Sequence, residues 1–462
     1  MKSADNIRMQ NVDQLIQNNS ECIFEYNVSE VCKNVLKSII KNVPFTKELY
    51  TLIEWKKAML ANTNPYVTDI MNITINYGKS KTSINTMITN AYDVIERNGN
   101  LYKYENLTLF SHQKELFTMC ATHQETPKLI LYTAPTGTGK TLSPIGLSNG
   151  YKIIFVCVAR HVGLALAKSA ISIEKKVAFA FGCDSTSDIR LHYFSAIDYE
   201  VNRRSGGIWR VDHSNGNNVE IMICDVYSYL HAMRYMCAFN ERNTMLTYWD
   251  EPTMTLDYEV HPLHDIIKQN WSENVIPNLV LSCATLPKEE EIHECIMDYC
   301  TYFPNAIVHT ITSFDCRKSI PILNSSGFSF IPHIHSETID QLQEYSNYCI
   351  RNKTLLRYFD LEEIVKFLLY VHEHGLIDKN YEMDQYFDSI SDVTMNTLKL
   401  YYLEVLRRMN EESWKNCRTY LSLQQKKKYA ISNNLNGGKL QRIQSVQNTS
   451  NVLNETIRRN NS

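Results

Sequence analysis

Eight consecutive residues, Ala-Pro-Thr-Gly-Thr-Gly-Lys-Thr, have the composition of a loop that binds phosphate groups. They follow an apolar run, residues 129–132, that is typical of a buried strand. Gly137 and Gly139 allow a tight turn that exposes backbone N–H groups, while the Lys140 ammonium can reach the β- and γ-phosphates of a nucleotide. The Thr141 hydroxyl can ligate Mg²⁺. The residues predicted to bind nucleotide are Ala134, Pro135, Thr136, Gly137, Thr138, Gly139, Lys140 and Thr141.

Two adjacent carboxylates, Asp250 and Glu251, end a second apolar run that begins at Met245. Asp250 can hold Mg²⁺ together with Thr141, and Glu251 can orient and deprotonate the water that attacks a γ-phosphate. An acidic pair at the end of a strand is often only a helix cap or a surface turn. The phosphate-binding loop upstream favours the catalytic interpretation, with Lys140, Asp250 and Glu251 as the catalytic residues.

From about Asn106 the chain alternates between short apolar runs and helical stretches. This alternation predicts a doubly wound α/β domain with a parallel sheet. Ligands of such sheets bind beyond the carboxyl ends of the strands, where the loop and the acidic pair are expected. The predicted strands are 129–133, 153–158, 177–181, 220–224, 245–249, 279–282 and 306–311, and the predicted helices are 161–173, 226–236, 263–269 and 289–299.

The segments on either side of this domain have helical patterns. We expect a helical accessory region over residues 1–105, the nucleotide-binding domain over 106–320 and a mainly helical region over 321–430. Residues 431–462 form a polar, basic tail. A solvated, disordered end is the more frequent explanation of such a tail, and contact with nucleic acid is the alternative.

The overall composition is that of a globular protein outside the membrane. The chain has 462 residues, 44% of them hydrophobic and 21% charged, and no apolar stretch approaches the ~18 residues that span a bilayer. Because the first residues lack the apolar core of a signal peptide, we expect a cytoplasmic protein. A net charge of −3 shows no overall excess of positive charge of the kind that favours nucleic-acid binding. It does not exclude binding through local contacts to phosphates.

Cysteines and histidines do not form a recognisable metal site. The 13 cysteines include no Cys-x-x-Cys pair, which favours reduced thiols over disulfides or zinc binding. The pairs His333/His335 and His372/His374 lack further ligands at metal-site spacing. We therefore expect no metal other than the Mg²⁺ that accompanies a nucleotide.

A third segment, Ser282-Cys283-Ala284-Thr285, follows the apolar run 279–281. In this order and spacing, the phosphate-binding loop, the acidic pair and this segment resemble motifs I, II and III of superfamily 2 helicases of the DEAD/DEAH-like group. The resemblance implies the first RecA-like domain of such an enzyme, with ATP and Mg²⁺ as cofactors and RNA or DNA as partner. It also implies that Ser282, Ala284 and Thr285 couple the ATP state to the surface that separates strands.

Two weaker matches extend the resemblance. Gln113 lies where the family has a glutamine that contacts adenine, although an ordinary glutamine at a helix start is an almost equal alternative. Arg160 lies where motif Ia touches the nucleic-acid backbone, and Asp225 and Ser228 lie near motif Ib. The amino-acid composition of the chain and the residues around Asp250 also resemble those of helicases of large DNA viruses. This resemblance would place the protein in the host cytoplasm or the virion.

The sequence departs from the family in two respects. Thr253 stands where the subgroups carry Asp or His, so the choice between RNA and DNA stays open. After residue 312 the sequence has no Gln-x-x-Gly-Arg-x-Gly-Arg-like stretch, which in the family supplies the arginine fingers of a second RecA-like domain.

The missing stretch has three explanations: the second domain comes from another polypeptide, the chain is a truncated or split helicase, or a much diverged domain lies in residues 336–462. The helical composition of residues 336–462 counts against the last one. Three interpretations of the function are weighed. The first is an ATP-dependent helicase-like protein that couples ATP binding and hydrolysis to nucleic-acid remodelling, with a second polypeptide supplying the other domain. The second is a truncated or split half-helicase that acts as a nucleotide-dependent binding module with little turnover. A phosphate-loop ATPase of another kind, such as a packaging motor, is disfavoured by the Ser-Cys-Ala-Thr segment.

Overall fold

The computed structural model describes residues 20–57, 63–103, 109–201, 207–255, 258–316, 318–325, 327–423, 429–431 and 440–442. The chain divides into two compact units. One consists of residues 109–315, and the other combines residues 1–108 with 316–462. Most of the predicted basic tail, residues 431–462, lies outside the described residues.

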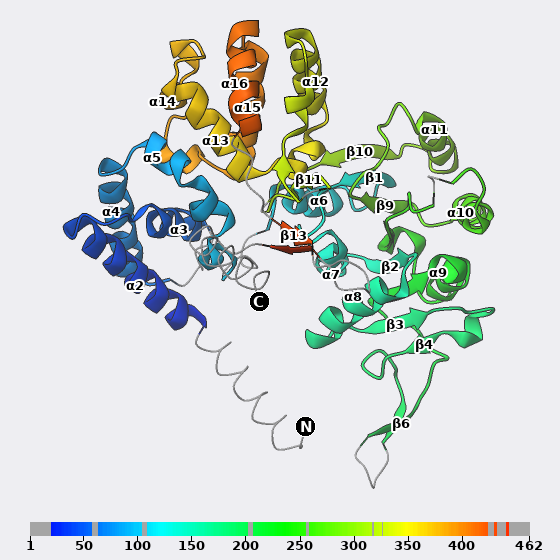
Figure 1. Cartoon of the computed structure of the whole chain (residues 1–462). Coiled ribbons are helices and arrows are strands. Elements are labelled where there is room, and N and C mark those ends of the chain that lie inside the picture. Colours follow the sequence, from blue (N-terminus) through cyan, green and yellow to red (C-terminus); the bar gives the residue numbers. More distant parts are fainter. Residues whose placement is uncertain are drawn as a thin grey trace, which may run out of the picture. The chain divides into compact units, whose positions relative to one another are not determined.

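The unit of residues 109–315 is built on an eight-stranded sheet (Figure 1). Its strand order is β10-β1-β9-β8-β2-β7-β3-β4, and all neighbouring pairs are parallel except β3 with β4. The strands are β1 (Lys128–Thr133), β2 (Lys152–Cys157), β3 (Val177–Ala180), β4 (Arg190–Leu191), β7 (Ile221–Asp225), β8 (Met245–Asp250), β9 (Asn278–Cys283) and β10 (Ile307–Thr312). The predicted α/β fold with a mostly parallel sheet is therefore confirmed.

Apolar side chains alternate between the two faces of this sheet because successive strand residues point in opposite directions. On β2, Phe155 joins the core under α6, α7 and α8, whereas Val156 joins the core under α9 and α10. A third cluster packs Leu131 of β1 against α10 and α11. These helices are α6 (Ser111–Thr122), α7 (Ser143–Leu147), α8 (Arg160–Ser172), α9 (Tyr229–Cys237), α10 (Pro262–Ser272) and α11 (His293–Tyr302).

The register of the parallel strands brings their carboxyl ends to one edge. Thr133 of β1 lies beside Cys283 of β9, and Asp250 of β8 lies beside both Ser282 of β9 and Cys157 of β2. Strand β9 thus separates β1 from β8, so the loops that follow these three strands meet at the same edge. A short hairpin, β5 (Tyr199–Val201) with β6 (Ile208–Val211), forms a separate two-stranded sheet that the sequence patterns did not predict.

The second unit is mainly helical in its described residues. Its α-helices are α2 (Ser20–Ile40), α3 (Thr46–Lys57), α4 (Pro65–Ser80), α5 (Ile84–Thr89), α12 (Ile339–Arg351), α13 (Leu361–Glu373), α14 (Met383–Tyr386), α15 (Met395–Arg408) and α16 (Glu411–Leu423). Its strands form two short antiparallel pairs, β11 (Ile322–Leu323) with β12 (Ser329–Phe330) and β13 (Tyr429–Ile431) with β14 (Leu440–Arg442).

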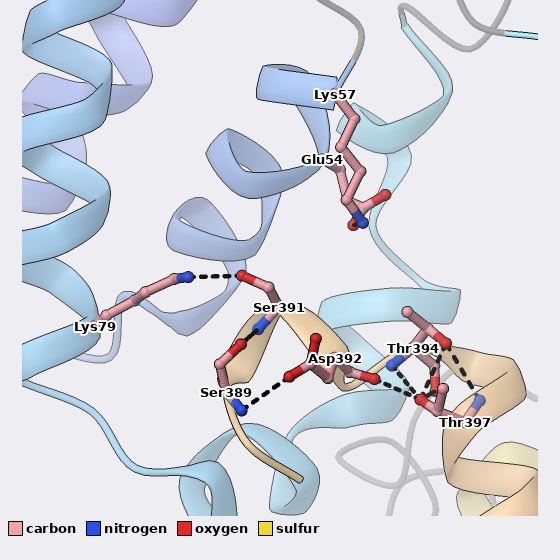
Figure 2. A network of polar contacts seen from close by, with 8 residues as sticks. All are labelled: Glu54, Lys57, Lys79, Ser389, Ser391, Asp392, Thr394 and Thr397. Atoms are coloured by element: carbon pink, nitrogen blue, oxygen red, sulfur yellow. Dashed lines mark hydrogen bonds and ion pairs between the residues drawn. The ribbon is translucent and has the colours of Figure 1, made fainter.

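Polar contacts join the N-terminal and C-terminal helices of this unit. Lys79 near the end of α4 donates to Ser391 Oγ at 2.6 Å (Figure 2). Ser391 belongs to a turn closed by Asp392, which accepts a hydrogen bond from the Ser389 N–H at 2.9 Å. The Asp392 carbonyl in turn accepts from Thr397 at 2.6 Å. Across the described part of the chain, none of the helices combines the length and the apolar character needed to cross a bilayer.

Candidate active site

The loop of residues 134–141, which the sequence predicts to bind phosphate, leaves β1 in a conformation that favours its glycines. Gly137 has a φ of 85° and Gly139 a φ of 79°, which is the left-handed region. A Cβ at Gly139 would also lie 2.9 Å from the Gln113 side-chain nitrogen. The turn is closed by Thr138, whose hydroxyl donates to the Pro135 carbonyl at 2.7 Å. The positive φ of Gly139 is the feature that favours glycine at this position, because the Gln113 side chain could move away from a Cβ.

The Lys140 side chain lies between the loop and the acidic pair. Its buried ammonium donates to the Ala134 carbonyl at 2.5 Å and is 3.9 Å from Glu251 Oε1. The ammonium is thus held at the end of the loop that the sequence predicts to bind phosphate. An anionic phosphate there would gain a charged donor, and hydrogen bonds from a charged donor are stronger than neutral ones.

Asp250 is buried beside Thr141. Its Oδ2 accepts a hydrogen bond from the Thr141 hydroxyl at 3.2 Å, whereas its buried Oδ1 has no hydrogen-bond partner among the described residues. Burial and then the charge of Glu251 raise the pKa of the Asp250 carboxyl to about 6, partly opposed by Lys140. Mg²⁺ prefers oxygen ligands of this kind, a carboxylate and a hydroxyl. The donor set therefore fits Mg²⁺.

Glu251 has a strained backbone and a fixed side chain. Its φ is 54°, which is uncommon for a residue other than glycine, and its N–H donates to the Ser282 carbonyl at 2.7 Å. Its Oε2 accepts a hydrogen bond from the Cys283 thiol at 2.8 Å, while the side chain keeps an exposed fraction of 39%. Strain of this kind persists where surrounding contacts impose it and is common at functional sites. Glu251 therefore reaches solvent from a defined position next to Lys140.

Cys283 connects the third segment to Glu251 through its side chain, whereas Ser282 does so through its backbone carbonyl. Besides Glu251, the Cys283 sulfur lies 3.1 Å from the Thr253 hydroxyl and 3.4 Å from the Thr285 N–H. The Ser282 hydroxyl is buried and has no hydrogen-bond partner within the described ranges. Ala284 is half-buried, and Thr285 is exposed. The sequence analysis did not assign a functional role to Cys283, because a cysteine in an apolar run is usually a small core residue. The Ala-Thr pair directly after Cys283 is the signal that could have placed it in the candidate site.

Gln113 lies against the phosphate-binding loop. Its side-chain N–H donates to the Gly139 carbonyl at 3.4 Å, and its side-chain oxygen accepts from the Phe110 N–H at 3.1 Å. The preceding residue, His112, is buried, bonds Tyr132 Oη at 2.6 Å and stacks on Phe110. Burial lowers the pKa of His112 to about 4, so the ring is neutral at physiological pH. His112, which the sequence patterns did not single out, thereby ties the start of α6 to β1.

Arg160 lies apart from this centre, at the start of α8. Its guanidinium makes two hydrogen bonds to Asp225 Oδ2, at 3.2 and 3.0 Å, and its exposed fraction is 60%. Asp225 also accepts from the Gly182 and Ser228 N–H groups, both at 2.9 Å. Asp225 and Ser228 therefore bond within the protein, and Arg160 is the residue of this group that faces solvent. The side-chain hydrogen bonds of Arg160 found among the described residues go to Asp225 and not to Lys140 or Asp250.

No protein-family model and no curated protein sequence matches this chain. A solved structure of a hypothetical ATP-dependent RNA helicase from Sulfolobus tokodaii is similar with a TM-score of 0.29 and 15% identity, over 51% of this chain and 61% of that one. Dbp5 of S. cerevisiae, in a complex with Nup159 and Gle1, gives a TM-score of 0.26 and 14% identity over 45% and 54% of the two chains.

The helicase domain of Hef from Pyrococcus furiosus is similar with a TM-score of 0.27 and 15% identity, over 63% of this chain and 52% of that one. The chain thus spans between about half and three-fifths of the length of these three structures. At these identities and TM-scores, the likeness carries no conclusion about the activity of this chain.

Proposed function

We propose that this protein is a nucleic-acid-dependent ATPase of the superfamily 2 helicase type. One observation carries the proposal. The Thr141 hydroxyl meets the buried carboxylate of Asp250 at 3.2 Å, next to a loop in which Lys140 lies 3.9 Å from Glu251. These four side chains come from two segments far apart in the sequence, and together they provide the groups that phosphoryl transfer from ATP requires.

Each group has a distinct role in the proposed reaction. Backbone N–H groups of residues 136–141 and the Lys140 ammonium bind the phosphates. Thr141 and Asp250 would hold Mg²⁺, which when bound neutralises phosphate charge. Glu251 accepts a proton from the attacking water, because its carboxylate is fixed by Cys283 and still reaches solvent. Gln113 lies beside the loop at 3.4 Å from the Gly139 carbonyl and is our candidate for the adenine contact.

Nucleic acid is proposed to bind at the carboxyl edge of the sheet. Arg160 is held by Asp225 with much of its guanidinium exposed, which suits a contact to a backbone phosphate. Because Cys283 bonds Glu251 and lies 3.4 Å from the Thr285 N–H, the segment 282–285 is suited to transmit changes at the catalytic carboxylate to this surface.

A second candidate is a half-enzyme that binds ATP with little turnover. It is favoured by the described residues after 316, which form helices and short antiparallel pairs and contain no second parallel sheet. An arginine finger is worth ~10³ to 10⁵ in rate. On this alternative a second polypeptide supplies the arginine, and the chain by itself hydrolyses ATP slowly.

The deciding experiment is phosphate release from ATP by the full chain, with and without single-stranded or duplex RNA or DNA. We expect stimulation by nucleic acid that is lost in Lys140→Ala and in Glu251→Gln. Mg²⁺–ATP binding without turnover in any of these mixtures would favour the half-enzyme. Absence of ATP binding would contradict both candidates.

A further inference from the structure

The helix after the phosphate-binding loop cannot form its first regular hydrogen bond. In an α-helix the carbonyl of residue i accepts from the N–H of residue i+4. For Lys140 this residue is Pro144, which has no N–H. Residues Lys140–Leu142 instead form a 3-10 turn (η4), in which the Ser143 N–H bonds the Lys140 carbonyl, and α7 begins only at Ser143.

Tyr248 provides a second donor to the same carbonyl. Its hydroxyl bonds the Lys140 carbonyl at 2.8 Å from the buried strand β8, and its ring stacks on Phe155 with centroids 6.0 Å apart. Tyr248 precedes Asp250 by two residues, so both side chains project from the same face of β8. Burial raises the pKa of the Tyr248 phenol well above its usual range, which keeps the hydroxyl protonated as a donor.

Two of the hydrogen bonds found among the described residues join the phosphate-binding loop to β8. One is the bond from Tyr248 to the Lys140 carbonyl, and the other runs from the Thr141 hydroxyl to Asp250 at 3.2 Å. The second bond uses the two groups proposed to ligate Mg²⁺, so it must change when the metal binds. The first uses neither of them and can persist through nucleotide and metal binding.

We propose that Tyr248 is a positioning residue that sets the distance between Thr141 and Asp250, and that it does so in place of the helical hydrogen bond that Pro144 removes. This inference rests on the proposed function. Its consequence is specific: loss of the Tyr248 hydroxyl weakens Mg²⁺ binding more than it weakens nucleotide binding, because Mg²⁺ needs both oxygen groups at once.

The test is a double-variant cycle on the full chain with a fluorescent ATP analogue and Mg²⁺ titrations. Tyr248→Phe is expected to raise the Mg²⁺ concentration for half-maximal binding about 3- to 10-fold, the range for loss of one neutral hydrogen bond. Pro144→Ala alone should behave like the wild type. The double variant should recover most of the loss, since the alanine that replaces Pro144 would supply the missing N–H to the Lys140 carbonyl.

Tyr229→Phe is the matched control. Tyr229 is also fully buried, and its hydroxyl bonds Thr247 at 3.1 Å and Asn274 at 2.7 Å, away from the loop. Its loss should lower thermal stability without changing the Mg²⁺ titration. If Tyr248→Phe does not fold by itself, recovery of folded, Mg²⁺-binding protein in the double variant supports the proposal.

Three results would overturn the inference. They are an unchanged Mg²⁺ titration in Tyr248→Phe, a double variant as impaired as Tyr248→Phe, and a Tyr229→Phe variant with the same Mg²⁺ defect. A wild-type chain that binds no ATP analogue would instead overturn the proposed function, and this inference with it.

Discussion

At the residue scale, the carboxyl of Asp250 couples metal binding to pH. Burial and the charge of Glu251 raise its pKa to about 6, so below that pH the protonated acid predominates in the metal-free protein. Because Mg²⁺ must displace the proton, we expect its apparent affinity to fall about tenfold for each pH unit below 6 and to level off above it. Mg²⁺ titrations with a fluorescent ATP analogue between pH 5 and 8 measure this.

The Glu251→Gln variant tests whether the Asp250 carboxyl is the group that makes Mg²⁺ binding depend on pH. Removing the neighbouring negative charge should shift the transition to lower pH, because that charge is the second cause of the raised pKa. A transition that stays in place in Glu251→Gln would mean that a group other than Asp250 controls Mg²⁺ binding.

Cys283 allows the link between the acidic pair and the third segment to be tested by a change of one atom. Cys283→Ser keeps a donor for Glu251, whereas Cys283→Ala removes it. We expect turnover close to wild type in the serine variant and about tenfold lower in the alanine variant, with ATP affinity unchanged in both. Steady-state phosphate release and equilibrium ATP binding separate the two effects. Equal turnover in both variants would show that the thiol only fills space.

At the element scale, Gly163 determines how closely α8 packs on the sheet. A Cβ there would lie 2.8 Å from Ile223 and 3.0 Å from both Cys157 and Phe181. Gly163→Ala should therefore cost about 1 to 3 kcal/mol of unfolding free energy. Displacement of α8 should also weaken nucleic-acid binding through Arg160, the first residue of the helix.

Gly150→Ala, in the turn between α7 and β2, is the control for a glycine substitution without a close contact, because the nearest contact of its Cβ would be Gln124 at an ordinary 3.7 Å. Chemical denaturation and binding of a labelled oligonucleotide provide the two measurements. A Gly163→Ala variant that is as stable as Gly150→Ala would contradict the packing argument. A destabilised variant with unchanged oligonucleotide binding would instead argue against Arg160 as the nucleic-acid contact.

At the scale of the whole molecule, the residues proposed to bind nucleotide all lie in the unit of residues 109–315. A bound ligand increases the free energy of unfolding of the unit that binds it, by an amount that grows with ligand concentration and affinity. Hydrogen exchange should therefore show that Mg²⁺–ATP protects β1, β8 and α7, while α2, α4 and α15 of the other unit exchange as before. Lys140→Ala should abolish the protection. Equal protection of both units would mean that nucleotide binding is coupled to the helical unit.

The sequence predicted the parts of this protein that depend on local residue types. Alternating apolar runs predicted the α/β fold, which is confirmed, because the strands of a sheet covered on both faces are apolar throughout. The loop predicted to bind phosphate and the acidic pair stood out because the chemistry proposed for them requires glycines, a lysine and carboxylates at short spacing. Their functional roles, like the domain boundaries, stay predictions to be tested by the experiments above.

Only the tertiary structure decided which of these residues meet. The placement of β9 between β1 and β8 brings Cys283 to Glu251, and the register of β8 brings Tyr248 to the Lys140 carbonyl. In the same way, Lys79 meets Ser391 although 312 positions separate them. Local patterns carry no information on strand order or on which distant helices pair. The physical reason is that these contacts depend on how the whole chain buries its apolar surface, whereas strand and loop character depend on a few neighbouring residues.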